Sequence, residues 1–345
     1  MISHNNISHK PYLGSTPIAQ VWLGYILIYP EDTVDYSTQY LTFEVVDGGT
    51  IEFVATDESV SKTISYSLDN GRTWTDLTSS TSYQSMGGTL SAGDKVLVKG
   101  RNNTYASNDR GYYNHFTSTA KVNVYGNIMS LISGDDFVGN KTLTEINTFY
   151  HLFADNSKLL SAKHLILPAT TLTSYCYAYM FWNCANFTTA PQLPATTLST
   201  FCYQYMFREC TNLVNAPQLP ATTLAKSCYN GMFYDCYRLE TAPELPATTL
   251  ADYCYSTMFS QCRSLRTAPV LPATTLPNRC YYRMFNGCTP LNYIKAMFTT
   301  TPSTSYTGEW VSGVAPSGTF VKNSAATWDV TGVNGIPSGW TVVTE

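Results

Sequence analysis

Charged residues are scarce in this sequence. They make up 13% of its 345 residues, well below the usual share of about 25% in soluble proteins. The 20 basic and 24 acidic side chains leave a net charge of −4. Binding to nucleic acid or to an anionic membrane surface normally needs an excess of lysine and arginine. We therefore expect neither kind of partner.

Long apolar runs and targeting signals are also missing. The most apolar stretch, residues 21–30, is about half of the roughly 20 residues that span a bilayer. The first residues lack the apolar core of a signal peptide, and no cysteine for a lipid anchor precedes Cys176. We expect a chain that is made without secretion and is not inserted into a membrane.

Motifs of catalysis and of cofactor binding are absent as well. The sequence has no GxSxG, no glycine-rich phosphate loop and no HExxH, and its acidic residues form no conspicuous pair. We therefore predict that the protein is not an enzyme, with no catalytic residue, no metal site and no cofactor. Apolar residues reach 44%, with 26 Tyr and 15 Phe, so the chain has material for a core.

An internal repeat organises the second half. The hexapeptide LPATTL occurs five times with a period of 26 residues, at 167–172, 193–198, 219–224, 245–250 and 271–276. The full consensus is LPATTLxxxCYxxMFxxCxxLxxAPx. A unit of this length cannot bury its own apolar side, so its copies must stack around a shared core. We predict a solenoid over residues 149–300.

The spacing within one unit predicts its local structure. The constant residues of TLxxxCYxxMFxxC fall at i, i+4, i+5 and i+8, which predicts a helical turn or short helix. The stretch before each hexapeptide predicts a short strand, which the Ala-Pro pair shortens because proline lacks an amide donor. We expect the array to end at 291–302, where the hexapeptide is lost.

All ten cysteines lie in the repeats, two per copy and eight residues apart. This spacing does not match a zinc site, and none of the five histidines keeps the repeat phase. Disulfides and metal binding remain alternatives, but we favour free thiols that pack as small apolar residues.

The consensus resembles the BspA-like leucine-rich repeats of Bacteroidetes surface proteins, whose units carry an aromatic-x-x-Cys-x-x-Leu core followed by a strand and Leu-Pro. The resemblance covers residues 149–300. It implies a curved solenoid that binds host or surface ligands, and it does not imply catalysis.

The rest of the chain predicts a mainly β protein with short helices. Residues 37–125 alternate apolar and polar positions in five stretches, at 40–46, 50–55, 63–68, 94–100 and 120–126, which predicts a β-sandwich. Residues 67–74 match the Asp-box pattern SxDxGxTW, which predicts a structural hairpin. Residues 126–148 are expected to link and cap the solenoid with a short helix, and residues 301–345 to form a small C-terminal cap.

The N-terminal segment, residues 1–36, carries an aromatic-Leu-Gly doublet at Tyr12-Leu13-Gly14 and Trp22-Leu23-Gly24-Tyr25. It resembles the N-terminal segments of fibre-type virion proteins from Bacteroides-infecting (crAss-like) phages. That resemblance implies a docking element with Tyr12, Leu13, Trp22, Leu23 and Tyr25 as contact residues. The alternative is an ordinary edge hairpin of the sandwich.

Two functions fit these features. The first is a virion structural protein of a tailed phage, a head or tail fibre or decoration protein, that forms a homotrimer and joins other virion proteins through residues 1–36. The second is a secreted or cell-surface BspA-like adhesin.

In both cases a glycan or another cell-surface ligand would contact aromatic residues at variable positions, since aromatic faces can stack on pyranose rings. The candidates are Tyr175, Phe201 and Tyr253 in one register and Tyr179 and Tyr205 in another. The alternative is that these are ordinary surface or inter-subunit residues.

Overall fold

A computed structural model describes residues 12–13, 16–17, 21–23, 26–29 and 34–345. The chain divides into two compact units, Met1–Tyr36 and Ser37–Glu345. The protein is mainly β with a few short helices, as the sequence predicts.

The first unit contains two short antiparallel hairpins. Strand β1 (Tyr12–Leu13) pairs with β2 (Thr16–Pro17), and β3 (Val21–Leu23) pairs with β4 (Ile26–Tyr29). This segment therefore contains two hairpins. Of the predicted docking residues, Tyr12, Leu13, Trp22 and Leu23 lie in these strands, whereas Tyr25 lies outside the described residues.

The second unit begins with two sheets. The larger sheet has seven strands in the order β13-β12-β5-β10-β7-β8, with β14 also paired to β12, and the smaller has the order β11-β6-β9. The strands of the larger sheet are β5 Leu41–Val45, β7 Thr63–Ser67, β8 Thr75–Thr78, β10 Lys95–Gly100, β12 Val122–Asn127, β13 Leu159–Ser161 and β14 Leu165–Ile166. The strands of the smaller sheet are β6 Ile51–Ala55, β9 Gln84–Ser85 and β11 Asn114–Ser118.

All five predicted strands are present, and the core between the sheets is aromatic. Phe43 of β5 lies 5.1 Å from Phe116 of β11, measured between ring centroids, and Phe116 stacks on Phe53 of β6 at 4.8 Å. The sequence missed β8, β9 and β11. Two 3₁₀ turns, η1 (Tyr36–Thr38) and η2 (Glu58–Val60), complete this region.

The Asp-box hairpin joins β7 to β8 and has the predicted structural role. Asp69 accepts hydrogen bonds from the amide and hydroxyl of Thr73, at 2.9 and 2.7 Å, and these bonds lower the pKa of Asp69 to about 2. Gly71 has a φ of +83°, and its carbonyl accepts a hydrogen bond from the Trp74 indole.

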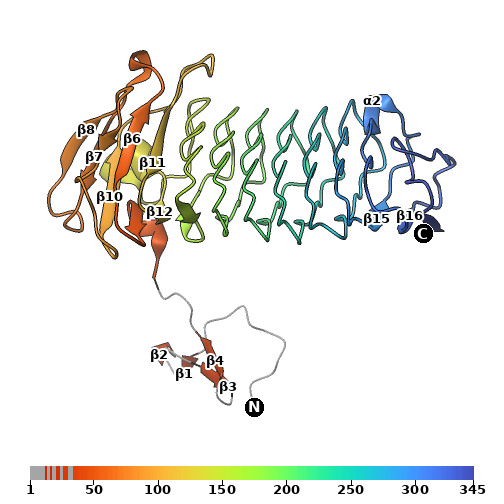
Figure 1. Ribbon diagram of the computed structural model, residues 1–345, viewed down its shortest axis with the longest axis horizontal. Helices are drawn as coiled ribbons and strands as arrows, with labels where there is room; N and C mark the ends of the chain where they lie inside the picture. The colour runs from red at the N-terminus through yellow and green to blue at the C-terminus, as the bar shows by residue number, and fades with distance from the viewer. Residues whose placement is uncertain (1–11, 14–15, 18–20, 24–25, 30–33) are drawn as a thin grey trace. The chain divides into compact units, whose positions relative to one another are not determined.

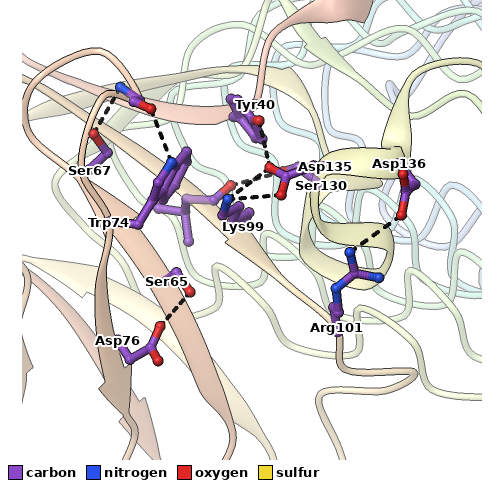
Figure 2. A network of polar contacts seen from close by, with 12 residues as sticks. Tyr40, Ser65, Ser67, Trp74, Asp76, Lys99, Arg101, Ser130, Asp135 and Asp136 are labelled. Carbon is purple, nitrogen blue, oxygen red and sulfur yellow. Dashed lines mark hydrogen bonds and ion pairs between the residues drawn. The ribbon is translucent and has the colours of Figure 1, made fainter.

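A helical segment follows β12 and packs on the larger sheet. It consists of α1 (Ser130–Ser133) and η3 (Gly134–Phe137). Asp135 accepts hydrogen bonds from Tyr40 at 2.7 Å and from the Lys99 ammonium at 2.8 Å, and this ammonium also lies 4.0 Å from the centroid of the Trp74 ring. Figure 2 shows this network, which joins Tyr40, the residue before β5, to Lys99 of β10 and Asp135 of η3. Burial, with the bond to Asp135, raises the pKa of Tyr40 to about 12.

The 26-residue copies form coils that lie side by side (Figure 1). Neighbouring coils are joined by backbone hydrogen bonds at every second residue of the turn segment. The Tyr177 amide donates to the Cys202 carbonyl at 3.0 Å, and the Tyr179 amide donates to the Gln204 carbonyl at 2.9 Å. The amide between them, that of Ala178, donates within its own coil to Tyr175 at 3.1 Å. The backbone amides therefore alternate: one donates within its own coil and closes a turn, and the next donates to the neighbouring coil.

The predicted helix in each unit is wrong. The segment is a run of consecutive turns in which every fourth residue has a positive φ, such as Tyr175, Tyr179 and Asn183 at +57°, +57° and +56°. A right-handed α-helix cannot contain such residues, because each of its residues has a φ of about −63°. A turn that repeats every four residues places i, i+4 and i+8 on one side, which imitates helical spacing.

On the strand side, neighbouring coils share fewer backbone hydrogen bonds than the strands of a regular sheet. Neighbouring coils meet there in single-residue parallel bridges, such as Thr189 with Asn215 and Asn215 with Thr241. Pro217, two residues after Asn215, has no amide donor. The predicted shortening of the strands is thus confirmed.

The interior of the coils is a set of ladders in which each side chain packs on its equivalent one coil away. Phe207, Phe233 and Phe259 stack at centroid distances of 5.7 Å, with interplanar angles of 5–6°. A second ladder contains the five consensus tyrosines, and all ten cysteines are free and buried. The later cysteine of each copy also hydrogen bonds to a phenylalanine carbonyl of the preceding coil: Cys184 to Phe153, Cys210 to Phe181, Cys236 to Phe207, Cys262 to Phe233 and Cys288 to Phe259, at 3.0–3.2 Å.

The sheets contact the first coil directly. Strand β12 pairs in parallel with β13 and β14 of the first coil. Phe116 of β11 stacks on Phe153 of that coil at 5.9 Å. The larger sheet therefore continues directly into the row of coils.

The array does not end at residues 291–302. Strands β15 (Tyr293–Ala296), β16 (Thr319–Lys322) and β17 (Thr341–Thr344) pair in parallel and continue the row of bridges. Helix α2 (Thr304–Thr307) begins a degenerate turn segment, in which the Phe285 amide donates to the Trp310 carbonyl at 2.8 Å. The residues expected to form a separate cap are thus further coils, with Trp310 fully buried.

The ladders predict that an interior charge is far more damaging than a surface charge. Met232 is fully buried, whereas Lys226 is exposed in the same coil. Met232→Asp should lower the free energy of unfolding by several kcal/mol (about 2–7), because it buries a polar group without a partner. Lys226→Asp should change it by about 0.5 kcal/mol or less. Urea denaturation measures both, and equal losses would contradict the assigned interior.

The free thiols predict that reducing agent leaves the melting temperature unchanged, since a disulfide typically contributes about 2–4 kcal/mol. Burial raises the pKa of Cys202 to about 12, so the reactive thiolate is almost absent at neutral pH. A thiol reagent should therefore react slowly with the folded protein and count ten thiols in denaturant. A count below ten, or a clear loss of stability on reduction, would reveal disulfides.

Candidate functional site

The turn segments place their positive-φ residues on one outer side of the coils, here called the turn face. Three positions per coil belong to it, for example Phe201, Tyr205 and Glu209. All five predicted ligand residues are of this kind, with φ values of +57° for Tyr175 and Tyr179, +59° for Phe201 and Tyr253, and +52° for Tyr205. Bulky side chains rarely adopt this conformation, so the hydrogen bonds between coils impose it.

The structure brings four of the five predicted residues together in two pairs. Tyr175 stacks on Phe201 with ring centroids 4.6 Å apart, and Tyr179 lies 5.1 Å from Tyr205. Tyr253 lies apart, because the small and buried Ser227 occupies the register position between it and Phe201.

Much of the aromatic surface in these pairs is already covered by protein. The Arg110 guanidinium lies 4.2 Å from the centre of the Tyr175 ring, so this ring lies between Arg110 and Phe201. Tyr179 stacks on His151 with ring centroids 4.6 Å apart. The Tyr205 ring packs against Gly231, where a Cβ atom would collide with it. Around Tyr175, this part of the face therefore offers ring edges, hydroxyls and the Arg110 guanidinium, and the role of Tyr175 in ligand binding stays a prediction.

Several residues of this cluster were missed by sequence reasoning. Tyr113 comes from the end of a hairpin in the sheets, and Tyr150 and His151 come from the degenerate first coil. Tyr113 stacks on His151 at 4.3 Å, and Tyr150 lies 4.4 Å from the same ring, while Trp182 approaches it edge-on at 5.5 Å. None of these residues except Trp182 lies in a regular copy of the repeat, so no periodic signal marks them.

Arginine side chains continue the aromatic surface along the turn face. Arg208 lies 5.3 Å from the centre of the Tyr205 ring and 5.0 Å from that of Tyr234, and it pairs with Glu209 at 2.8 Å. Arg279 lies over Tyr253 and Tyr282 at 5.8 and 5.3 Å. Surfaces rich in tyrosine and arginine are typical of binding sites, because these side chains combine large contact area with directed hydrogen bonds.

The two histidines of the cluster are neutral packing groups. The Nδ1 atoms of His115 and His151 are buried without a hydrogen-bond partner. Burial, and to a smaller extent the neighbouring His115, lowers the pKa of His151 to about 3, and burial lowers that of His115. Across residues 12–13, 16–17, 21–23, 26–29 and 34–345, no group of three or more His, Cys, Asp or Glu side chains is placed to hold a metal ion.

Comparison with protein families, with curated proteins and with solved structures finds no match for this chain. The described part of the chain has no helix that is both long enough and apolar enough to cross a membrane.

The buried His151 predicts a stability that falls in acid. Its pKa is lower in the folded protein than the usual value of about 6.5 in an unfolded chain, so the unfolded state binds more protons as the pH drops. Protonation of His151 in the unfolded state should lower the free energy of unfolding by up to about 3 kcal/mol between pH 6.5 and pH 4, whereas above pH 6.5 this contribution is fully present. His151→Phe keeps an aromatic ring but cannot titrate, so urea denaturation across this range should show a shallower decline. Identical slopes in the two proteins would contradict this assignment.

Proposed function

We propose that the protein is a virion structural protein of a tailed phage, a head or tail fibre or decoration protein. The observation that carries this proposal is the division of the chain between Tyr36 and Ser37. The second unit has a continuous core of its own from Leu41 to Trp340. The first unit is an apolar segment with short hairpins, which is suited to docking onto other virion proteins.

The fold supports a display role for the second unit. We propose that residues 37–125 are a β-sandwich and that the coils form a leucine-rich-repeat solenoid of the BspA-like type. Each coil contributes the same inner residues and different outer ones, so the outer surface is free to vary without loss of the core. In a homotrimer, three copies of the turn face would act together on a repetitive surface and increase the avidity of weak contacts.

The turn face is the proposed site for a glycan or another cell-surface ligand. Its tyrosine hydroxyls and the Arg110 guanidinium supply hydrogen-bond donors beside exposed ring edges, which suits the hydroxyls of a sugar. Phe201 and Tyr253 retain apolar surface for the ring of a sugar, since both are only half-buried.

The alternative function is a secreted or cell-surface adhesin, and the consensus of the repeat favours it. The same turn face would then contact the host, and residues 1–36 would have no partner in a virus particle. The two functions therefore differ in what the first 36 residues do.

Deletion of residues 1–36 tests the proposal. The second unit has its own core, so the truncated chain should unfold cooperatively at the melting temperature of the full-length protein. In a phage that lacks the gene, the full-length chain supplied in trans should purify with the virions, and the truncated chain should not.

Two controls make this result specific. The exposed Lys226→Asp variant of the full-length chain should enter particles normally, and Trp22→Asp should reduce incorporation while leaving the melting temperature unchanged. Normal incorporation of the truncated chain would overturn the docking role. Failure of the full-length chain to enter any particle would overturn the virion assignment and leave the adhesin.

A further inference from the structure

A small hairpin, residues 105–113, carries Arg110 from the sheets onto the turn face. The Ser107 amide donates to the Tyr112 carbonyl at 2.8 Å, and the Arg110 amide donates to the Ser107 carbonyl at 3.0 Å. Arg110 has a φ of +64°, and backbone conformations of this kind cluster at ligand-binding sites. Its guanidinium lies 4.2 Å from the centre of the Tyr175 ring. The hairpin therefore adds one basic side chain to the aromatic part of the turn face.

This hairpin is fixed to the start of the first coil by hydrogen bonds. The Asn147 side-chain amide donates to the Ser107 carbonyl at 3.0 Å, and the Thr104 hydroxyl donates to the Asn147 carbonyl at 3.0 Å. The Tyr105 amide donates to the Thr148 carbonyl at 3.1 Å. The hairpin is therefore ordered before any ligand binds, which reduces the conformational entropy lost on binding.

No carboxylate pairs with Arg110, and no acceptor receives its side-chain N–H groups, within residues 34–345. The neighbouring Asp109 carboxylate accepts hydrogen bonds from two donors of the hairpin itself, at 2.6 and 3.1 Å, and these bonds lower its pKa. Asp155 accepts a hydrogen bond from the Asn183 side-chain amide at 2.8 Å. Both carboxylates are thus bonded to groups other than the guanidinium.

Arg110 differs in burial from the other arginines that lack an acceptor in this part of the chain. Arg72, Arg266 and Arg279 are exposed, so water serves their N–H groups, whereas Arg110 is half-buried. A guanidinium that is already partly desolvated loses less hydration when an anion binds to it. Arg110 is therefore the better anion-binding group.

Tyrosine hydroxyls near Arg110 add further hydrogen-bond donors. The Tyr150 ring lies 6.1 Å from that of Tyr113 and 5.6 Å from that of Tyr179, measured between centroids. Burial raises the pKa of Tyr150 to about 12, against a smaller opposite effect of the Arg110 charge, and burial also raises the pKa of Tyr113 and of Tyr179. These phenols are therefore protonated at neutral pH. None of their hydroxyls makes a hydrogen bond within residues 34–345, so all three are available as donors.

We propose that Arg110 binds the anionic group of an acidic glycan, either the carboxylate of a uronic acid or a sulfate ester. This ligand class narrows the glycan role proposed for the turn face and rests on it. The planar guanidinium donates two parallel N–H bonds to such a group, and the Tyr150 hydroxyl donates to another of its oxygens. A neutral sugar offers no charge that matches the charge of Arg110.

The aromatic stack beside Arg110 provides a contact for the next residue of the glycan. Phe201 lies 4.6 Å beyond the Tyr175 ring, measured between centroids, and is half-buried. Its remaining surface is apolar and packs against the C–H face of a sugar ring. An inorganic anion would contact only Arg110 and the tyrosine hydroxyls, so a glycan uses more of this site than a free sulfate ion does.

The test uses the full-length protein and three polyacrylamide polymers that carry glucuronic acid, glucose 6-sulfate or glucose. Surface plasmon resonance should show saturable binding to an acidic polymer at least tenfold tighter than to the glucose polymer, and the preferred polymer distinguishes a carboxylate from a sulfate. Arg110→Gln should weaken this binding at least tenfold, because it removes the charge and the paired donors. The control Arg266→Gln removes the same charge from an exposed arginine on the strand side and should leave the affinity unchanged.

Two further measurements separate binding from folding. Arg110→Lys keeps the charge but not the paired donors, so its affinity should fall between those of the unaltered protein and Arg110→Gln, at an unchanged melting temperature. With the unaltered protein, the methyl glycoside of the preferred acidic sugar should compete at least tenfold better than methyl glucoside or inorganic sulfate.

Equal affinity for the glucose polymer, or unchanged acidic-polymer binding by Arg110→Gln, would overturn the anionic site and leave the turn face as a site for glycans. Competition by inorganic sulfate as strong as that by the glycoside would show an anion site without sugar recognition and would also overturn the proposal. Failure of all three polymers to bind would overturn it together with the glycan role of the turn face, whereas the virion assignment is decided separately by incorporation into particles.

Discussion

The row of hydrogen bonds between neighbouring turn segments is the interaction on which the rest of the structure depends. Alternate amides, such as those of Tyr177 and Tyr179, donate hydrogen bonds to the next coil. The amides between them close turns within their own coil. This division forces every fourth residue to a positive φ and directs two of the three intervening side chains inward, such as Met206 and Phe207. The aromatic ladders follow, because coils joined in this way place each Phe and Tyr over its equivalent one coil away.

The sequence predicted the repeat, its buried positions and the five main strands, because each depends on a periodic pattern of apolar residues. It failed on the turn segment because a four-residue turn and a 3.6-residue helix give nearly the same spacing over eight residues. It also failed at the ends of the array. Trp310 and the strands from Tyr293 onward continue the coils without the hexapeptide, so backbone pairing persists where the sequence signal has gone.

The candidate site was predictable only in part, for a related reason. Variable aromatic positions mark the outer surface, which is how Tyr179 and Tyr205 were found. Their neighbours Tyr113 and His151 come from outside the regular copies, and only the fold brings them to the same place. That the Tyr175 ring is enclosed by Arg110 depends on how a hairpin of the sheets lies against the first coils.

The two outer sides of the coils differ in how many backbone hydrogen bonds join neighbouring coils. On the turn side, bonds between coils recur at every step, so the variable side chains there stand on a rigid frame and form a continuous surface. On the strand side, neighbouring coils are joined only by isolated single-residue bridges, and prolines remove further donors. Between Thr241 and Thr267, where the described residues form neither a bridge nor the neighbouring backbone bonds, a groove of about 580 Å³ lies between the two coils, while the turn side stays closed. A repeat with this asymmetry can acquire a local site by small changes in one coil, and the core that neighbouring coils share is left intact.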